Sequence, residues 1–128
     1  MKTRSLVVAS VLGLISAAGA YGHGDHKPKY GGMVGRGDEE VVVEFVVAKD
    51  KVTVYVEDEQ GKGIETKDFK GTLTLVPQQG PPKDVALVPA GSNTLTAAGL
   101  QPVRGVRLIA RLTLPGGQQL QSVALYAQ

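Results

Sequence analysis

Apolar and polar positions alternate along the chain from about residue 39 onward, which is the pattern of strands with one buried face. Lys49 and Asp50 form a short connection between two such runs, residues 41–48 and 52–56. The second run places its three valines on one face, and the first does the same with Val41, Val43, Phe45 and Val47. The two runs therefore predict a β-hairpin.

Further short runs follow, and all but the last are ended by glycine or proline. They predict single strands and then a long terminal hairpin, over residues 72–76, 84–88, 94–97, 106–114 and 120–126. About seven strands at short spacing, without a stretch of helical period, predict an all-β domain. A sandwich resembling the immunoglobulin or fibronectin type III class fits this spacing best. A small barrel is the alternative, because the cysteine and tryptophan markers of true immunoglobulin domains are absent from the sequence.

The first twenty residues have a different pattern. Lys2 and Arg4 precede an apolar core that runs into small residues, which is the layout of a secretory signal peptide. The core is roughly 13 residues long, shorter than the about 20 that a membrane-spanning helix needs. We therefore expect cleavage, export to the periplasm and no stable membrane anchor. The small residues allow a cut after Ala18, Ala20 or Gly22, and the cut after Ala20 is favoured.

Cleavage after Ala20 changes the charge of the chain. It removes two of the 14 basic residues and none of the 12 acidic ones, so 12 of each sign remain and the net charge is zero. Basic and acidic residues are interleaved, which gives no basis for nucleic-acid binding. The absence of cysteine excludes disulfides and thiolate chemistry. The 108 residues that remain (128 minus 20) suit a single domain.

We expect three parts: a signal peptide over residues 1–20, with a cut after residue 22 as the alternative, a flexible segment over 21–38, and the β domain over 39–128. The middle segment is rich in glycine and contains both histidines of the chain, His23 and His26. Imidazole nitrogens suit Cu(II), Ni(II) and Zn(II), and Asp25 adds a carboxylate oxygen. These three residues are the candidate metal ligands.

The position of the cut decides which ligands the new N-terminus offers. A cut after Ala20 makes His23 the third residue, so the amine, two backbone nitrogens and the imidazole can surround Cu(II) or Ni(II) in a plane. A cut after Gly22 makes His23 the first residue, whose amine and ring can chelate copper with His26 nearby. Either start favours copper, with Ni(II) or Zn(II) second. The alternative is that both histidines are solvated residues of a polar segment.

Other candidates have simpler interpretations. Met33 is interpreted as a packing residue and Tyr30 as a lid on the edge of the domain. The acidic residues 57–59 lack the spacing of a calcium loop, and Arg107 and Arg111 are explained by a solvated sheet face. Catalytic motifs such as Gly-x-Ser-x-Gly and His-Glu-x-x-His are absent, and the predicted β domain contains no histidine to act as a base. We therefore expect a non-enzyme.

Two segments carry a resemblance to a known group of proteins. The first is His23-Gly24-Asp25-His26-Lys27-Pro28-Lys29-Tyr30-Gly31-Gly32. The second, after a valine-rich strand with Glu44, is Val54-Tyr55-Val56-Glu57-Asp58-Glu59-Gln60-Gly61-Lys62. They resemble small periplasmic proteins encoded beside heavy-metal efflux systems of the RND type, and are similar to the histidine-containing N-terminal segments of the adaptor subunits of those pumps. The resemblance implies a periplasmic setting and metal handling.

The sequence therefore favours an exported protein that binds a divalent transition metal, copper first, through its N-terminal segment. A metal-efflux adaptor or another envelope protein is the expected partner, and the protein would be accessory to metal efflux or resistance. The alternative is a metal-independent β-domain that binds another envelope protein through its strand edges or loops.

Overall fold

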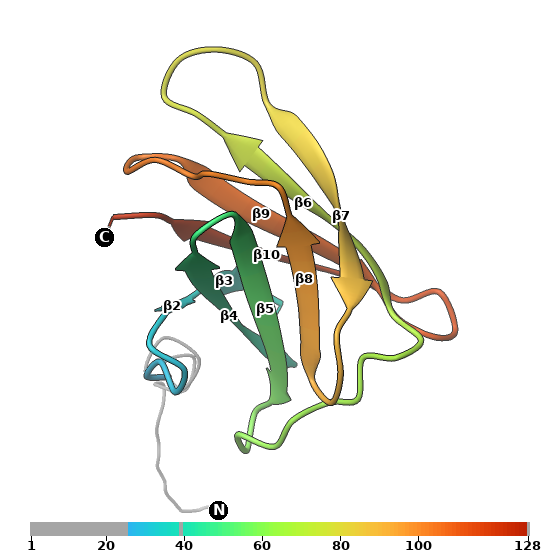
Figure 1. The fold of residues 1–128 in the computed structure, drawn as a ribbon. Helices are drawn as coiled ribbons and strands as arrows, with labels where there is room; N and C mark the ends of the chain where they lie inside the picture. The colour runs from blue at the N-terminus through green and yellow to red at the C-terminus, as the bar shows by residue number, and fades with distance from the viewer. Residues whose placement is uncertain (1–25, 39, 128) are drawn as a thin grey trace, which may run out of the picture.

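The computed structural model describes residues 26–38 and 40–127, in which the regular secondary structure is entirely β-strand (Figure 1). No helix long and apolar enough to cross a membrane occurs in these residues. The predicted signal peptide, His23 and Asp25 lie outside the described residues. The strands are β2 (Met33–Val34), β3 (Arg36–Gly37), β4 (Val41–Ala48), β5 (Lys51–Asp58), β6 (Lys70–Val76), β7 (Lys83–Pro89), β8 (Thr94–Ala98), β9 (Arg107–Thr113) and β10 (Gln119–Leu125).

All strand pairings in the described chain are antiparallel, and the nine strands follow the order β2-β4-β5-β8-β7-β6-β9-β10-β3 in one sheet. Only Gly35 separates β2 from β3, yet these two strands occupy opposite edges of the sheet. β2 pairs with β4, and β3 pairs with β10. The segment 33–37 therefore bridges the two edges, and the sheet is nearly closed.

The structure confirms the predicted all-β class, but the predicted sandwich of about seven strands is not confirmed. Nine strands are present in the described residues, and they form one barrel-like sheet. The two strands that the sequence analysis missed, β2 and β3, are two residues long each. Alternation of apolar and polar residues needs about four positions to be recognised, so strands this short leave no such pattern.

Both predicted hairpins are confirmed. β4 and β5 pair in register from Val41 opposite Asp58 to Ala48 opposite Lys51, and Asp50 turns the chain with a φ of 62°. β9 and β10 pair along seven residues each, from Thr113 opposite Gln119 to Arg107 opposite Leu125. Local chemistry therefore suffices to place these neighbours in the sheet.

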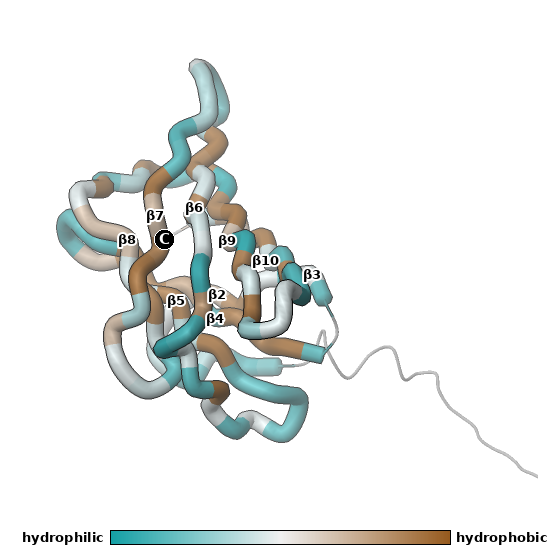
Figure 2. Tube along the Cα trace, turned by 90° about the vertical axis from the view of Figure 1, so that its right-hand side faces the viewer, coloured by the Kyte–Doolittle hydropathy of each residue, from teal (hydrophilic) through white to brown (hydrophobic). Residues whose placement is uncertain are grey.

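The hydrophobic core lies inside the sheet and collects the inward-facing residue of every second position. Hydrophobic and hydrophilic residues alternate along β9 and β10 in Figure 2. Partly buried residues outside the main strands, including Met33 and Ile64, pack against this core. Met33 is therefore a packing residue, as interpreted from the sequence. The fully buried side chains with the largest volumes are Phe45, Leu73, Leu95, Leu100, Leu108, Leu112, Val52, Val54, Val56 and Thr66.

The bridging segment and the residue before it, Gly32, fit because glycines allow the backbone to touch the two edge strands. A Cβ atom at Gly32 would overlap the carbonyl oxygen of Phe45 in β4, and one at Gly37 would overlap the carbonyl oxygen of Gln121 in β10. Any side chain at these positions would push the bridge away from the sheet.

Candidate functional site

The candidate site lies on the outer face of β4 and β5. Glu44 is directly opposite Tyr55, and Val42 is directly opposite Glu57, so these four side chains share the face that points away from the core. Residues 29–32 lie over this face, because their backbone and side chains hydrogen-bond to both glutamates. As a result, Glu44 is only 4% exposed and Glu57 only 6% exposed.

Glu44 holds the overlying chain through its backbone. The amide of Lys29 donates to Oε1 at 2.7 Å, and the amides of Tyr30 and Gly32 donate to Oε2 at 2.9 and 2.8 Å. A carboxylate buried this deeply needs such partners, and hydrogen bonds to a charged acceptor are stronger than neutral ones. Three amides can converge on one carboxylate because Gly31 turns the chain with a φ of 79°, in the left-handed region that glycine favours.

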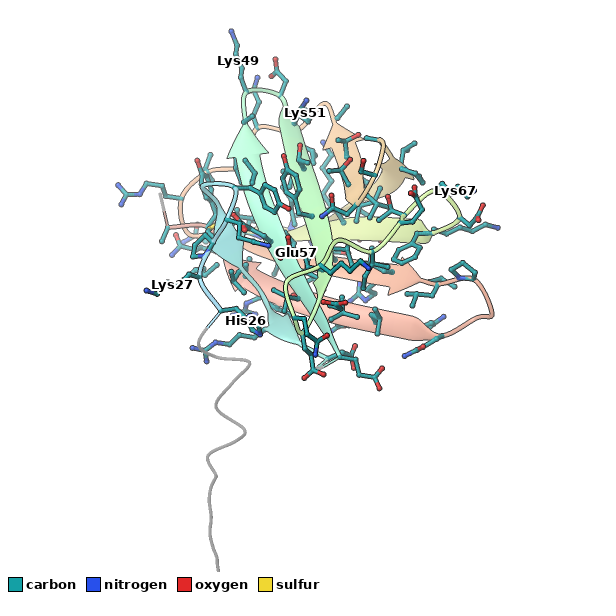
Figure 3. The ribbon with its side chains drawn as sticks, turned by 90° about the horizontal axis from the view of Figure 1, so that it is seen from below. His26, Lys27, Lys49, Lys51, Glu57 and Lys67 are labelled. Carbon is teal, nitrogen blue, oxygen red and sulfur yellow. The ribbon has the colours of Figure 1, made fainter. Side chains whose placement is uncertain are left out.

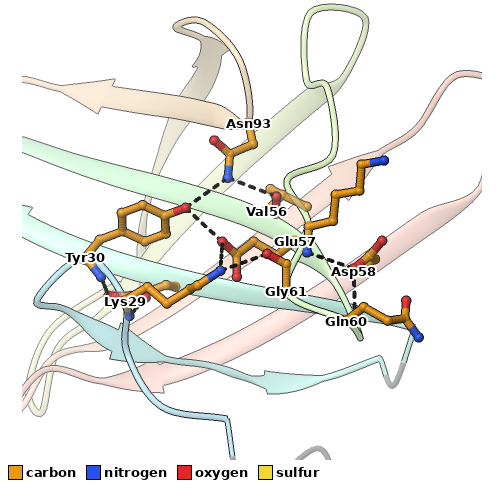
Figure 4. Close-up of polar contacts among 10 residues, drawn as sticks. Lys29, Tyr30, Val56, Glu57, Asp58, Gln60, Gly61 and Asn93 are labelled. Carbon is orange, nitrogen blue, oxygen red and sulfur yellow. Dashed lines mark hydrogen bonds and ion pairs between the residues drawn. The ribbon is translucent and has the colours of Figure 1, made fainter.

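Glu57 holds the side chains of the same segment (Figure 4). Its Oε2 atom accepts hydrogen bonds from Tyr30 Oη at 2.8 Å and from Lys29 Nζ at 3.1 Å. Lys29 Nζ also donates to the carbonyl oxygen of Gly61 at 2.8 Å, which ties the segment to the loop after β5. Asn93, just before β8, donates to the carbonyl oxygen of Val56 at 3.2 Å and more weakly to Tyr30 Oη at 3.5 Å. We call the contacts of Glu44 and Glu57 with residues 29–32 the glutamate clamp.

Tyr30 and Tyr55 complete the clamp. Their rings are nearly parallel, with an interplanar angle of 6° and centroids 3.7 Å apart. Tyr30 remains 38% exposed, so its ring covers Tyr55 while its hydroxyl reaches Glu57. The predicted lid is therefore seated over the face of β5, where stacking and a charged hydrogen bond act together.

His26 is the predicted metal ligand that the structure describes. It borders one hollow of about 290 Å³ that is also lined by Glu44, Glu57 and Glu59, and a second of about 290 Å³ on the side of Arg36 and Asp38. Figure 3 shows His26, Lys27 and Glu57 from this side of the molecule. The clamp holds the chain only three residues after His26, so it restricts where this imidazole can lie.

The other two predicted ligands, His23 and Asp25, lie outside the described residues. Within residues 26–38 and 40–127, no three histidine, aspartate or glutamate side chains are grouped so that they could hold a metal ion. A metal site at the N-terminal segment therefore stays a prediction.

The sequence analysis did not identify Glu44 and Glu57 as site residues. A signal was available, because Glu44 is the only charged residue in the strand Val-Val-Val-Glu-Phe-Val-Val-Ala. Burying an unpaired charge is costly, so a lone carboxylate within an apolar strand indicates a partner elsewhere in the chain. The partner itself, a turn fifteen to twelve residues earlier, has no periodic pattern that would reveal it.

Comparisons with protein-family models, with curated proteins and with solved structures gave no match to this chain.

Proposed function

We propose that this protein is an exported, periplasmic, non-enzymatic metal binder that takes up Cu(II) through His23, Asp25 and His26. Ni(II) and Zn(II) are weaker candidates for the same ligands. The observation that supports this proposal best is the glutamate clamp, because it anchors the histidine-containing segment to the β domain immediately after His26.

The clamp supports metal binding through entropy. A chain segment that is ordered only when a metal binds must lose conformational freedom at that moment, at about 1–2 kcal/mol per residue. The contacts that hold residues 29–32 to the folded domain are made by protein groups alone. The segment therefore has fewer residues left to order, and the affinity of a two-histidine site rises accordingly.

Electrostatics near His26 also favour a cation. Glu44, Glu57 and Glu59 line the same hollow as His26, and the basic residues there are Lys27 and Lys29. Lys29 is paired with Glu57, which leaves the hollow with a small excess of negative charge. The proposed role is accessory to metal efflux, and an efflux adaptor or another envelope protein would receive the metal. Both the role and the partner are proposed from the sequence resemblance.

The test is a Cu(II) titration of the exported protein, whose first residue is established by N-terminal sequencing and intact mass. The protein has four tyrosines and no tryptophan, so binding near the Tyr30–Tyr55 stack should quench tyrosine fluorescence. We expect one equivalent of Cu(II) to bind, and the double variant His23→Ala, His26→Ala to lose this binding. Lys27→Ala is the matched control and should bind normally. Equal binding by the double variant, or a mature chain that starts at Gly19, would contradict the proposal.

A metal-independent interaction module is the second candidate function. β7 pairs with β8 only at Val88 and Pro89, whereas its residues 83–87 pair only with β6 in the described chain. The outer edge of this stretch could accept a strand from another protein. Capture of an envelope protein by both the wild type and the double histidine variant, in the presence of a chelator, would favour this candidate over metal binding.

A further inference from the structure

One hollow lies on the outer face of a part of the sheet that does not include the clamp strands β4 and β5. It measures about 430 Å³ and is formed by three neighbouring strands, β6, β9 and β10. The strand register arranges its outward-facing side chains in two rows of three. These rows are Lys70, Thr113 and Gln119, followed by Thr72, Arg111 and Gln121.

The row between them points the other way. Gly71, Leu112 and Leu120 are in register across the same strands, and both leucines are buried in the core. The core side therefore fixes the three strands, while the outer side presents only cationic, hydroxyl and amide groups. Successive outward residues on a strand are about 7 Å apart, so the two rows span a surface about the size of a sugar ring or two.

The outer side chains of this hollow are largely unused by the fold. In the part of the chain that the structure describes, the side chains of Lys70, Thr72, Thr113, Gln119 and Gln121 form no hydrogen bond or ion pair with protein groups. Asp38 is the acidic residue at the rim, and its Oδ2 atom already accepts a hydrogen bond from the backbone amide of Gln121 at 2.9 Å.

Arg111 is the exception, because it is held in place. Its Nη1 atom donates to Thr74 Oγ1 at 2.9 Å, and Thr74 in turn donates to Asp84 Oδ1 at 2.6 Å. Thr74 is only 5% exposed, so this chain of hydrogen bonds is well defined. A guanidinium has five N–H donors, and this contact uses one of them. The others remain to bind a ligand from a preset orientation.

Two positive charges meet at this hollow. Lys70 and Arg111 are diagonal neighbours on adjacent strands, which places them roughly 7–8 Å apart at the backbone. Asp84 reaches Arg111 only through Thr74, and no described acidic group pairs with Lys70. Lys70 and Arg111 therefore give this face of the sheet two positive charges that no described acidic side chain contacts directly.

We propose that this hollow binds an acidic oligosaccharide. A sugar carboxylate would accept hydrogen bonds from the remaining N–H groups of Arg111, and Lys70 would add its charge from the neighbouring strand. Sugar hydroxyls would pair with the threonine and glutamine side chains. No tyrosine or phenylalanine lines the hollow, so there is no aromatic ring on which a neutral sugar could stack. Charge must therefore supply the affinity, which is why the ligand class is acidic. This site is independent of the proposed metal function.

The test uses nuclear magnetic resonance of the ¹⁵N-labelled exported protein, titrated with a trisaccharide of galacturonic acid and with its uncharged methyl ester. We expect the acid to shift the amide signals of residues 70–72, 111–113 and 119–121, and the ester to bind at least about tenfold more weakly. Lys70→Gln breaks no contact of the fold and should weaken binding of the acid at least about tenfold. Arg111→Gln should weaken this binding to a similar extent.

Arg107→Gln is the matched control, because Arg107 lies on the same strand and the same face but outside the hollow. It should bind the acid as the wild type does. Three results would overturn the proposal: no signal shift with the acid, equal binding of the acid and the ester, or unchanged binding by Lys70→Gln in a chain that retains its native spectrum. Tighter binding of a triglutamate peptide at the same residues would show that the site takes an acidic peptide instead.

Discussion

The outer face of β4 and β5 and the outer face of β6, β9 and β10 have the same kind of sequence but different environments. β5 and β9 carry mostly polar residues at the alternate positions that face away from the core, and the pattern alone assigns such positions to solvent. On the first face Glu44 and Glu57 are buried beneath residues 29–32, whereas on the second Lys70, Arg111, Gln119 and Gln121 remain exposed. An outward-facing residue is therefore exposed only where no other segment of the chain covers it.

The two faces should respond differently to loss of a polar side chain, and Glu44→Ala is the strongest test. It leaves three backbone amides without their acceptor, and we expect the free energy of unfolding to fall by about 3 kcal/mol. Chemical denaturation measures this loss, and hydrogen exchange should accelerate at Lys29, Tyr30 and Gly32. Gln119→Ala on the open face is the control, with a change within about 0.5 kcal/mol. Similar losses in the two variants would mean that the covered face is not held by Glu44.

A smaller effect is expected from Tyr30→Phe. This change removes the hydrogen bond to Glu57 Oε2 but keeps the ring that stacks on Tyr55, so unfolding should become easier by about 1 kcal/mol. Urea denaturation measures the loss of stability. The same measurement on Tyr126→Phe, near the other end of the chain, separates the effect of the hydrogen bond from the general effect of losing a hydroxyl. If Tyr30→Phe were as stable as the wild type, stacking alone would account for the position of Tyr30.

The smallest expected difference in stability is between replacing a paired lysine, Lys29, and replacing an unpaired one, Lys70. The side chain of Lys29 is 51% exposed, so solvent weakens its ion pair with Glu57, and Lys29→Gln should cost no more than about 1 kcal/mol. Lys70→Gln should leave stability unchanged or raise it slightly, because it removes repulsion from Arg111. Melting temperatures at low and high salt provide the measurement, and the cost at Lys29 should shrink as salt increases. A larger cost at Lys70 than at Lys29 would reverse the comparison.

Much of the fold could be predicted because it depends on local pattern. The hairpins of β4 with β5 and of β9 with β10 follow from alternating residues that flank a short turn, and both are present. The bridge formed by residues 33–37 could not be predicted, since its partners are Phe45 in β4 and Ser122 in β10, at different distances along the chain. The sequence contains the glycines of this region, but it does not reveal the backbone contacts that require them.

The candidate site shows the same division. His26 and the turn Lys29-Tyr30-Gly31-Gly32 were recognised as parts of one polar segment, and residues 29–32 of that segment fold onto the domain. The sequence analysis named Glu44 only as part of a valine-rich strand and Glu57 only as one of three neighbouring acidic residues. Neither position carries information about which segment covers it. The predicted ligands His23 and Asp25 lie outside the described residues, and their role rests on the metal titration.

By itself the sequence determined the all-β class, the core-facing residues of the long strands and the hairpin neighbours, because these depend on side-chain period and turn chemistry within a few residues. The tertiary structure alone decided that the sheet nearly closes, that Glu44 and Glu57 become buried anchors, and that Lys70 and Arg111 share a hollow. These features join residues far apart in the chain. Their energies come from hydrogen bonds and charges that exist only once the strands have assembled.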